Sequence, residues 1–401
     1  MLTEQTRALV KASVPALQAH GLALTQRFYE RLFLAHPALK EMFNQRHQQD
    51  GSQSQALAGA VLAYAQHIDR PEVLAGALTH IAHKHVSLGI RAEHYPLVGQ
   101  QLLGAMGDVL GEAATPELVA AWGQAYGWLA QQLIQAESAL YQASASQPGG
   151  WSGARSLRVR RKQVMSDTIC RFELVPVDGG PLPGYKPGQY VSVNFRSQPG
   201  GLAQWRQYSL VGAPGGDALE IAVKREGGDE GASGCPLGHV SASLHDRVKE
   251  GDILAVSAPA GDFSLHEDRD TPVVLLSAGV GITPMMAMLR QLAAQGSRRE
   301  LHFWHACQSP SHLAFQEEVI SAFQRLPQAQ LRVAFESQAP AAPWAQAGRL
   351  DAAQLPAHLA GVADAYLCGP RGFMQAQRER LLAAGWPGDR IHQETFGSGS
   401  A

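Results

Sequence analysis

The chain has 401 residues, and this length predicts two or three domains because a single hydrophobic core stops growing below that size. Hydrophobic residues make up 45% of the chain and charged residues 17%, a balance that excludes an intrinsically disordered protein. The formal net charge is -2 and no basic stripe is evident, which argues against nucleic acid as a partner.

The sequence has no pattern typical of a membrane segment or of a cysteine framework. Residues 1–7 lack an apolar signal core, and the apolar stretch at 273–282 is too short and too rich in glycine to span a bilayer. The four cysteines lie far apart, at Cys170, Cys235, Cys307 and Cys368. This spacing indicates neither a disulfide framework nor a zinc site, so we expect a reducing, cytoplasmic setting.

The first part of the chain, up to about residue 145, carries a helical pattern throughout. Apolar side chains recur at spacings of three and four, as at Leu24, Phe28 and Leu32. The same spacing predicts further helices around 73–88, 95–110 and 116–142. Because no stretch alternates with a period of two, this part is predicted to be all-α.

A break at residues 147–153, Gln-Pro-Gly-Gly-Trp-Ser-Gly, ends the helical pattern, because proline and paired glycines stop a helix. Beyond the break, side chains alternate with a period of two, as in residues 169–174. Turn clusters such as 178–181 separate the alternating stretches. The pattern predicts a small antiparallel β-barrel from about 152 to 265.

From about residue 270 the pattern changes again. Residues 273–277 form a continuous apolar run, which is typical of a buried parallel strand, and a helix is expected at 285–294. Further strands are expected at 301–304, 331–335 and 365–368, and a loop at 337–348. Strands that alternate with helices predict a doubly wound α/β sheet. The predicted domains are therefore 1–147, a linker at 148–153, 154–266 and 267–401.

One histidine in the helical part is a candidate metal ligand. His85 shares an apolar helix face with Leu78, Ile81 and Leu88, whereas His83 lies on the other side of the same helix. A lone histidine on an apolar face is more commonly a hydrogen-bonded core residue than a ligand. The spacing by itself leaves both interpretations open.

Two stretches in the second half have the residue types of nucleotide sites. In Arg206-Gln207-Tyr208-Ser209, the arginine and the serine can bind phosphate and the tyrosine ring can stack, although an ordinary strand also fits. The segment 279–284, Gly-Val-Gly-Ile-Thr-Pro, follows a predicted strand and begins a helix. Its glycines permit close approach of a pyrophosphate, Thr283 can cap the helix, and Pro284 suits its first turn.

The residues just described resemble a known family. The strand Arg206 to Ser209 resembles the flavin-binding strand of the ferredoxin-NADP reductase superfamily. Residues 35–39, Lys84-His85 and residues 122–127 resemble the globin half of bacterial flavohaemoglobins. The resemblance covers nearly the whole chain, including the Pro-Gly-Gly-Trp linker. It implies an all-α globin, then an antiparallel β-barrel that binds FAD, then an α/β doubly wound domain that binds the nicotinamide dinucleotide.

For the haem site, the resemblance implies a role for each matching residue. His85 is implied as the proximal iron ligand, and Tyr95 and Glu137 as the pair that hydrogen-bonds it. The distal pocket is implied to hold Tyr29, Gln53 and Leu57, while Phe43 packs on the haem. Tyr29 would donate a hydrogen bond to bound oxygen. Lys84 and Glu394 match a pair that bridges the haem and flavin domains.

For the flavin, the resemblance implies Tyr190, Arg206, Gln207, Tyr208, Ser209, Gly238, Val240 and Ser241. For the nicotinamide site it implies Gly279, Val280, Gly281, Ile282, Thr283, Pro284, Cys368, Gly369 and Pro370. The C-terminal segment over the flavin is implied to be Glu394, Thr395, Phe396, Gly397 and Ser398. This chain departs from the family pattern at His239, Ala242 and Ser398, where the family has Gln, Asn and Pro.

The activity that the resemblance implies is that of a nitric oxide dioxygenase. NAD(P)H reduces FAD, FAD reduces haem b, and the oxygen-bound haem converts nitric oxide to nitrate. An oxygen-binding or sensing globin with a fused reductase, and a flavin reductase of quinones or ferric iron, remain as alternatives. NADH is favoured over NADPH because no arginine cluster follows residues 305–308. We expect a monomer with small-molecule partners and no obligatory protein partner, and we allow for a lipid in the distal pocket.

Overall fold

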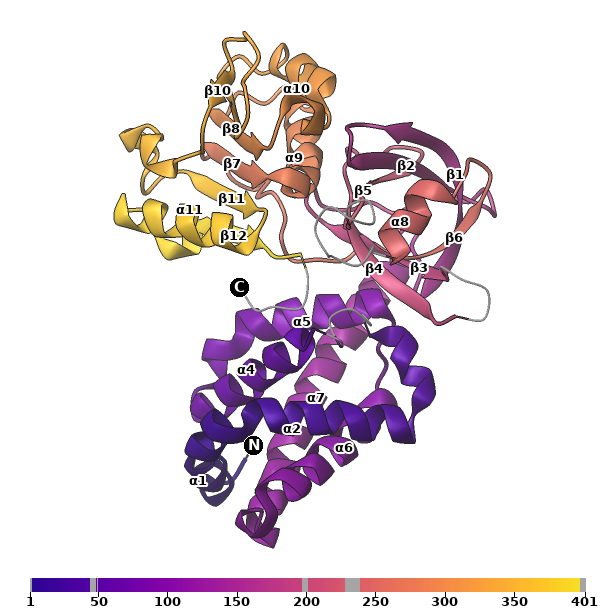
Figure 1. Cartoon of the computed structure of the whole chain (residues 1–401), viewed down its shortest axis with the longest axis vertical. Coiled ribbons are helices and arrows are strands. Elements are labelled where there is room, and N and C mark those ends of the chain that lie inside the picture. The colour runs from indigo at the N-terminus through magenta and orange to yellow at the C-terminus, as the bar shows by residue number, and fades with distance from the viewer. Residues whose placement is uncertain (1, 44–47, 49, 197–200, 228–238, 397–401) are drawn as a thin grey trace.

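The computed structural model describes residues 2–43, 48, 50–196, 201–227 and 239–396, and it shows three consecutive domains (Figure 1). A helical domain is followed by a β-barrel and then by an α/β domain. The three-domain architecture predicted from the sequence is confirmed.

The first domain is built from helices. They are α1 (Glu4–Ala12), α2 (Val14–Ala35), α4 (Ser52–Gln66), α5 (Ala75–Leu88), α6 (His94–Leu110) and α7 (Pro116–Ser146), with 3-10 turns at Pro37–Met42, Pro71–Leu74 and Gly111–Ala113. Side-chain caps define two of the starts: Thr3 accepts a hydrogen bond from the Thr6 amide, and Thr115 accepts one from the Leu118 amide. Leu24, Phe28, Leu32 and Trp122 belong to one buried core cluster of this domain.

The second domain is a six-stranded antiparallel sheet. Its strands are β1 (Ala154–Val164), β2 (Ile169–Pro176), β3 (Tyr190–Arg196), β4 (Ala203–Ser209), β5 (Leu219–Lys224) and β6 (Ile253–Ser257), in the order β4-β3-β6-β1-β2-β5. A bridge between Leu210 and Ile221 joins the two outer strands, so the sheet closes into a barrel. Helix α8 (His239–Asp246) contributes Val240 and Leu244 to the barrel core.

The third domain is a parallel sheet with helices. Its strands are β7 (Val273–Ala278), β8 (Leu301–Cys307), β9 (Ala329–Phe335), β10 (Ala345–Ala347), β11 (Asp364–Cys368) and β12 (Ile391–Glu394). Its helices are α9 (Ile282–Ala294), α10 (Gln316–Phe323) and α11 (Arg371–Ala383), with 3-10 turns at Gly279–Gly281, Pro310–His312, Ala352–Gln354, Ala357–Leu359 and Gly388–Arg390. The strand order is β10-β9-β8-β7-β11-β12, so the winding direction reverses between β7 and β11. Ligands of such sheets bind at the carboxyl ends of the strands where the order reverses.

Three local predictions for this domain were wrong or incomplete. The predicted loop at 337–348 contains the short edge strand β10, which pairs with residues 333–335 of β9. A three-residue edge strand buries too few side chains to leave an alternating pattern. Helix α9 begins at Ile282 rather than at Met285, and β12 was not predicted at all.

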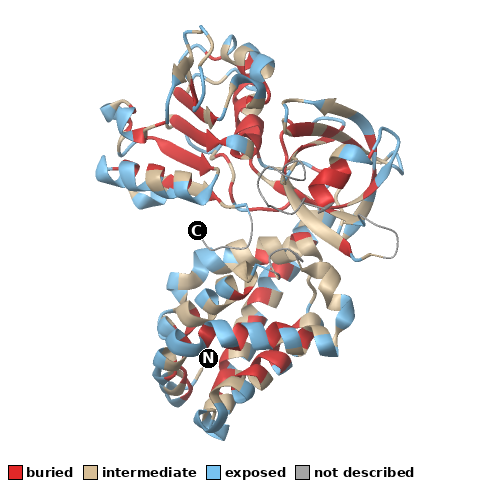
Figure 2. Ribbon diagram, viewed as in Figure 1, coloured by how far each residue is buried: buried red, intermediate tan, exposed pale blue. Residues whose placement is uncertain are grey.

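Burial follows the architecture (Figure 2): the central strands of the α/β sheet and the inward helix faces are buried. The three cysteines in the described residues, Cys170, Cys307 and Cys368, are unpaired and buried. A search of the described helices found none long and apolar enough to cross a membrane.

A charged network joins the barrel to the α/β domain. Arg290 of α9 donates hydrogen bonds to the Val211 carbonyl at 2.8 Å and to Glu220 at 3.0 Å, and it also pairs with Glu318. Arg171 of β2 reaches Glu318 of α10 at 2.9 Å. Because the arginines and glutamates come from both domains, the network fixes the position of α9 against the barrel.

Candidate active site

The imidazole of His85 is held by two residues from neighbouring helices. Its Nδ1 lies 2.7 Å from Oε1 of Glu137 on α7 and 3.1 Å from the hydroxyl of Tyr95 on α6. The Tyr95 hydroxyl donates to the same carboxylate oxygen at 2.5 Å. Glu137 is 2% exposed, so the carboxylate is shielded from water and fixes the orientation of the ring. Burial, followed by the Glu137 carboxylate, raises the pKa of the Tyr95 hydroxyl.

This arrangement fits a haem iron ligand. An ionised carboxylate can only accept, so Nδ1 of His85 carries the proton and Nε2 keeps its lone pair for a metal. A carboxylate behind an imidazole raises its basicity, and a metal-bound histidine usually has such a partner. The structure therefore brings His85, Tyr95 and Glu137 together as the resemblance implied.

A second group of side chains gathers around Tyr29 of α2. The Tyr29 ring packs against Phe33 and, edge-on, against Phe43, with centroid distances of 5.7 and 5.6 Å. The side chains of Gln53 and Gln48 lie beside the Tyr29 hydroxyl. Burial raises the pKa of this hydroxyl, so Tyr29 stays a hydrogen-bond donor.

The buried polar atoms of this group support a ligand pocket. Among the described residues, Gln53 Oε1 and Gln48 Nε2 are buried without a hydrogen-bond partner. An unpaired buried polar atom costs about 1–3 kcal/mol, and a functional site is one explanation for keeping it. Leu57 is half-buried beside the same core cluster. Gln48 was missed in the sequence because it lies in a polar stretch without helical spacing.

Strand β4 carries the candidate flavin residues. The Arg206 guanidinium donates hydrogen bonds to the Trp205 carbonyl at 2.8 Å and to the Gln204 side chain at 2.5 Å, and burial lowers its pKa. Ser209 is 4% exposed, and among the described residues its hydroxyl has no hydrogen-bond partner. A partly buried cation and an unpaired hydroxyl on one strand fit a bound phosphate group.

Two candidate flavin residues touch the helix that carries His85. The Gln207 side chain donates to the Ser87 hydroxyl at 2.9 Å, and the Tyr190 hydroxyl lies close to the same serine. Ser87 lies two residues after His85 on α5. Strands β3 and β4 therefore lie against the helix of the candidate haem ligand, and β4 is hydrogen-bonded to it.

The remaining candidate flavin residues lie near α8. Val240 is buried in the barrel core, and the Ser241 hydroxyl accepts a hydrogen bond from the Glu226 amide at 3.1 Å. Of the departures from the family pattern, His239 begins α8 and Ala242 is 8% exposed. Gly238, Gly397 and Ser398 lie outside the described residues.

The candidate nicotinamide residues meet where the sheet order reverses. Residues 279–284 follow β7, and Cys368 ends the neighbouring strand β11, followed by Gly369 and Pro370. A Cβ added to Gly281 would lie 2.1 Å from the Cys368 carbonyl oxygen, so only glycine allows the two turns to approach. Thr283 does not cap α9 as predicted, because its hydroxyl donates back to the Val280 carbonyl at 2.8 Å.

The end of β12 lies beside Cys368. Glu394 pairs in register with Cys368, and both side chains are buried. Burial raises the pKa of Glu394 to about 7, lowers the pKa of Lys84 on α5, and raises the pKa of the Cys368 thiol. Lys84 and Glu394 are close enough to interact electrostatically. Thr395 follows as part of the C-terminal segment, and Phe396 is 42% exposed.

Helix α5 lies at the junction with the reductase domains (Figure 1), and two of its other histidines contact the barrel. Nδ1 of His83 accepts a hydrogen bond from the Gly261 amide at 3.1 Å, and His80 pairs with Asp262 at 3.0 Å. Both partners lie just after β6, on the barrel side of the junction. His80 and His83 are therefore contacts between domains, which sequence spacing did not show.

These features define a class of protein: a globin-like helical domain with a histidine ligand, joined to an oxidoreductase with flavin and nicotinamide sites. Family models match three segments of the chain. They are Globin at residues 26–133, the Oxidoreductase FAD-binding domain at 156–265 and the Oxidoreductase NAD-binding domain at 275–379.

Curated relatives and solved structures match the full length. The Flavohemoprotein of Chromobacterium violaceum is 53% identical over 403 residues, covering 99% of each chain. The Flavohemoprotein of Bordetella pertussis is 49% identical, covering 100% of this chain and 99% of its own. The crystal structure of flavohemoglobin from Malassezia yamatoensis with bound FAD and heme superimposes with a TM-score of 0.87 at 30% identity, covering 99% of this chain and all of its own.

The FAD/NAD binding domain of nitric oxide dioxygenase from Vibrio cholerae also matches, with a TM-score of 0.56 and 40% identity. It covers 61% of this chain and 99% of its own. The chain belongs to the flavohaemoprotein family. It is an oxidoreductase whose cofactors are haem, FAD and a nicotinamide dinucleotide, as expected from the sequence.

The carboxylate behind His85 should set the haem potential. We expect Glu137→Gln to raise the ferric/ferrous midpoint, because an amide accepts a weaker hydrogen bond from the imidazole and donates less electron density. A loss of roughly 1.4 kcal/mol corresponds to a rise on the order of 60 mV. Spectroelectrochemistry measures it, with exposed Glu117→Gln as the control. An unchanged midpoint in Glu137→Gln would contradict this role.

The contact between the two nicotinamide turns allows a matched comparison. We expect Gly281→Ala to slow flavin reduction by NADH at least about tenfold, because its methyl group would collide with the Cys368 backbone. Gly279→Ala should have a smaller effect, since an added Cβ meets no atom within 4 Å there, although its φ of +54° strains alanine. Stopped-flow absorbance at equal flavin content measures both rates. Equal rates in the two variants would refute the steric explanation.

Glu394 should make stability depend on pH. Its folded pKa of about 7 lies above the ordinary 4.5, so the folded protein holds a proton that the unfolded chain releases between these pH values. Stability is therefore lost as pH rises from 4.5 to 7. Between pH 4.5 and pH 8 the loss is about 3 kcal/mol.

We expect Glu394→Gln to remove this part of the pH dependence. Urea unfolding at the two pH values measures it, with exposed Glu379→Gln as the control. The assignment fails if Glu394→Gln and the parent protein lose equal stability over this range.

Proposed function

We propose that the protein is an NADH-dependent nitric oxide dioxygenase. In this reaction one NADH supplies the electrons with which two molecules of nitric oxide and two of dioxygen become two nitrate ions. When bound, the nicotinamide supplies hydride, FAD divides the electron pair, and haem supplies the iron at which oxygen and nitric oxide react. The proposal rests on family membership and on what this chain's residues can do around these groups.

The observation that carries the proposal is the Glu137–His85 hydrogen bond at 2.7 Å. A strongly basic proximal ligand pushes electron density toward the iron and favours oxygen activation over reversible carriage. An oxygen carrier or sensor does not require this buried carboxylate. The similar FAD/NAD binding domain from Vibrio cholerae is part of a nitric oxide dioxygenase, and this similarity supports the same reaction.

The distal residues would control the bound oxygen. The Tyr29 hydroxyl is a buried donor, and the side chains of Gln53 and Gln48 lie beside it. A donor at this position stabilises negative charge that develops on a ligand, and the surrounding rings of Phe33 and Phe43 exclude water. Tyr29 and Gln53 would therefore bind and orient the reacting molecule, while His85 would hold the iron and Tyr95 and Glu137 would orient His85.

The reductase residues would deliver the electrons. Arg206 and Ser209 would anchor the flavin, and the turns at Gly281 and Cys368 would position the nicotinamide. Cys368 is fully buried, so water does not reach its thiol at the carboxyl end of β11. NADH is proposed because the residues after β8, at 308–316, contain no arginine that could bind the 2′-phosphate of NADPH.

We further propose that the protein acts as a monomer on small molecules, without an obligatory protein partner. A cytoplasmic setting is proposed because the buried cysteines of the described chain are unpaired, as in a reducing compartment. A lipid in the distal pocket stays a proposal, and the apolar residues Phe43 and Leu57 are the groups that would contact it.

Tyr29→Phe tests the proposed chemistry, because it keeps the ring and removes the hydroxyl. We expect oxygen to dissociate about ten to a hundred times faster, since a charge-assisted hydrogen bond contributes roughly 1.5–3 kcal/mol. Nitric oxide turnover at low oxygen should fall, while haem reduction by NADH stays nearly unchanged. Stopped-flow spectroscopy and nitric oxide consumption measure these rates.

These rates distinguish a nitric oxide dioxygenase from the alternative functions. An unchanged oxygen dissociation rate with slower haem reduction would place Tyr29 on the electron path instead. Absence of nitrate formation by the parent holoenzyme, with normal haem reduction, would favour the oxygen-binding alternative over the dioxygenase.

A further inference from the structure

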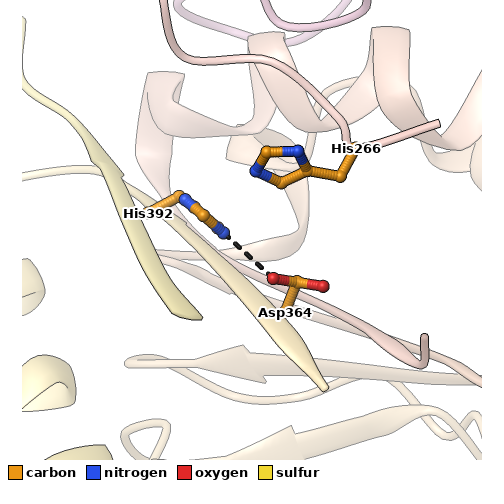
Figure 3. A group of neighbouring side chains, drawn as sticks. All are labelled: His266, Asp364 and His392. Atoms are coloured by element: carbon orange, nitrogen blue, oxygen red, sulfur yellow. Dashed lines mark hydrogen bonds and ion pairs between the residues drawn. The ribbon is translucent and has the colours of Figure 1, made fainter. Parts of the chain in front are cut away.

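Three polar side chains converge near the amino ends of strands β11 and β12 (Figure 3). The candidate nicotinamide residues lie at the opposite, carboxyl ends of the strands. His266 comes from the segment that joins the barrel to β7, Asp364 is the first residue of β11, and His392 lies on β12. At their carboxyl ends, the same two strands finish with Cys368 and Glu394. The convergence therefore lies outside the proposed reaction site.

The geometry of the three groups is close to that of a metal centre. One potential ligand atom from each residue lies within 4.8 Å of the others, and Nε2 of His392 is 3.2 Å from Oδ1 of Asp364. Ligands at the Zn²⁺ distances of ~2.0–2.1 Å are separated by roughly 3.3 Å. The His392–Asp364 pair already has this spacing, and the widest separation must close by at most about 1.5 Å.

The protein fixes the carboxylate and leaves one oxygen toward the imidazoles. Asp364 is 0% exposed, and its Oδ2 accepts a hydrogen bond from Thr271 at 2.6 Å. Its Oδ1 faces His392. His392 is itself held by stacking on Tyr366, with ring centroids 4.8 Å apart. Two of the three candidate ligands are thus positioned by the fold, and the partly exposed His266 can move to complete the set.

Two imidazoles and one carboxylate are the ligand set that proteins use for first-row transition dications, with water in the remaining positions. We propose that His266, Asp364 and His392 form a binding site for one divalent transition-metal ion, for which Zn²⁺ is the probe. The ion would join the segment after the barrel to two strands of the α/β sheet. It would therefore fix the barrel relative to the nicotinamide domain, independently of the proposed reaction.

Two arginines lie beside Asp364, and their positive charge opposes the binding of a cation unless they move or are balanced. Arg269 lies 3.2 Å from Oδ1 of Asp364, but its side chain is 40% exposed and can turn into solvent when an ion takes its place. Arg390 lies 3.6 Å from Oδ2 and also donates to the Val362 carbonyl at 2.9 Å. Asp268, 3.6 Å from Nδ1 of His266, supplies a second carboxylate that can hold the outer nitrogen of that ring.

Calorimetric titration of the chelator-treated holoprotein with Zn²⁺ tests the site. We expect one bound ion per chain, and a loss of affinity of at least about tenfold in His266→Gln and in His392→Gln. Even an outer-shell partner contributes ~10–100-fold to metal affinity. The exposed His358, which pairs with Glu300 at 2.9 Å, supplies the matched control His358→Gln, which should bind Zn²⁺ like the parent.

Haem and flavin contents, measured for every variant, show that the fold is retained. His266→Gln is the safer of the two variants, because its backbone amide, not its ring, donates to the Tyr366 hydroxyl at 2.9 Å. Zn²⁺ should also raise the melting temperature of the parent but not of the double variant. No specific binding by the parent, or equal affinity in parent and double variant, would overturn the proposal.

Discussion

The arrangement of the molecule depends on the two opposite faces of helix α5. Successive residues of a helix point about 100° apart, so His85 can turn inward while His83 and Ser87 turn outward. The inward face presents an imidazole to Glu137 at 2.7 Å, and the outward face bonds to Gly261 and Gln207 of the barrel. A single rigid element therefore carries both the candidate iron ligand and the contact surface for the flavin strands.

The junction between the domains also holds charged side chains that are largely removed from water. Lys84 of α5 and Glu394 of β12 interact there, and burial disfavours the charged form of each. Such a junction costs stability, which tight packing elsewhere must offset. The α/β domain is also held against the barrel, because Arg290 pairs with Glu220 and Arg171 pairs with Glu318. Charged contacts thus join the α/β domain both to the helical domain and to the barrel.

The sequence predicted the order of the three domains because the pattern of apolar residues differs between them. Apolar residues recur at spacings of three and four in the first domain, alternate in the second, and form continuous runs between helices in the third. It also separated His85 from His83, since helical spacing shows which residues share a face. It could not pair His85 with Glu137, which lies 52 residues away and by spacing alone resembles a solvated helical carboxylate. That role came from the family resemblance. Gln48, the strand β10 and the Asp364 cluster were not predicted, because each depends on contacts between distant segments rather than on a local pattern.

The buried cysteines have a consequence for a protein proposed to consume nitric oxide. Burial raises the pKa values of all three cysteines in the described chain, that of Cys307 to about 12. The nucleophilic form of cysteine is the thiolate, and these side chains stay protonated thiols at neutral pH. Nitrosating and oxidising species attack such thiols slowly. The fold therefore protects Cys368 chemically in a molecule whose haem domain would turn over reactive nitrogen and oxygen species.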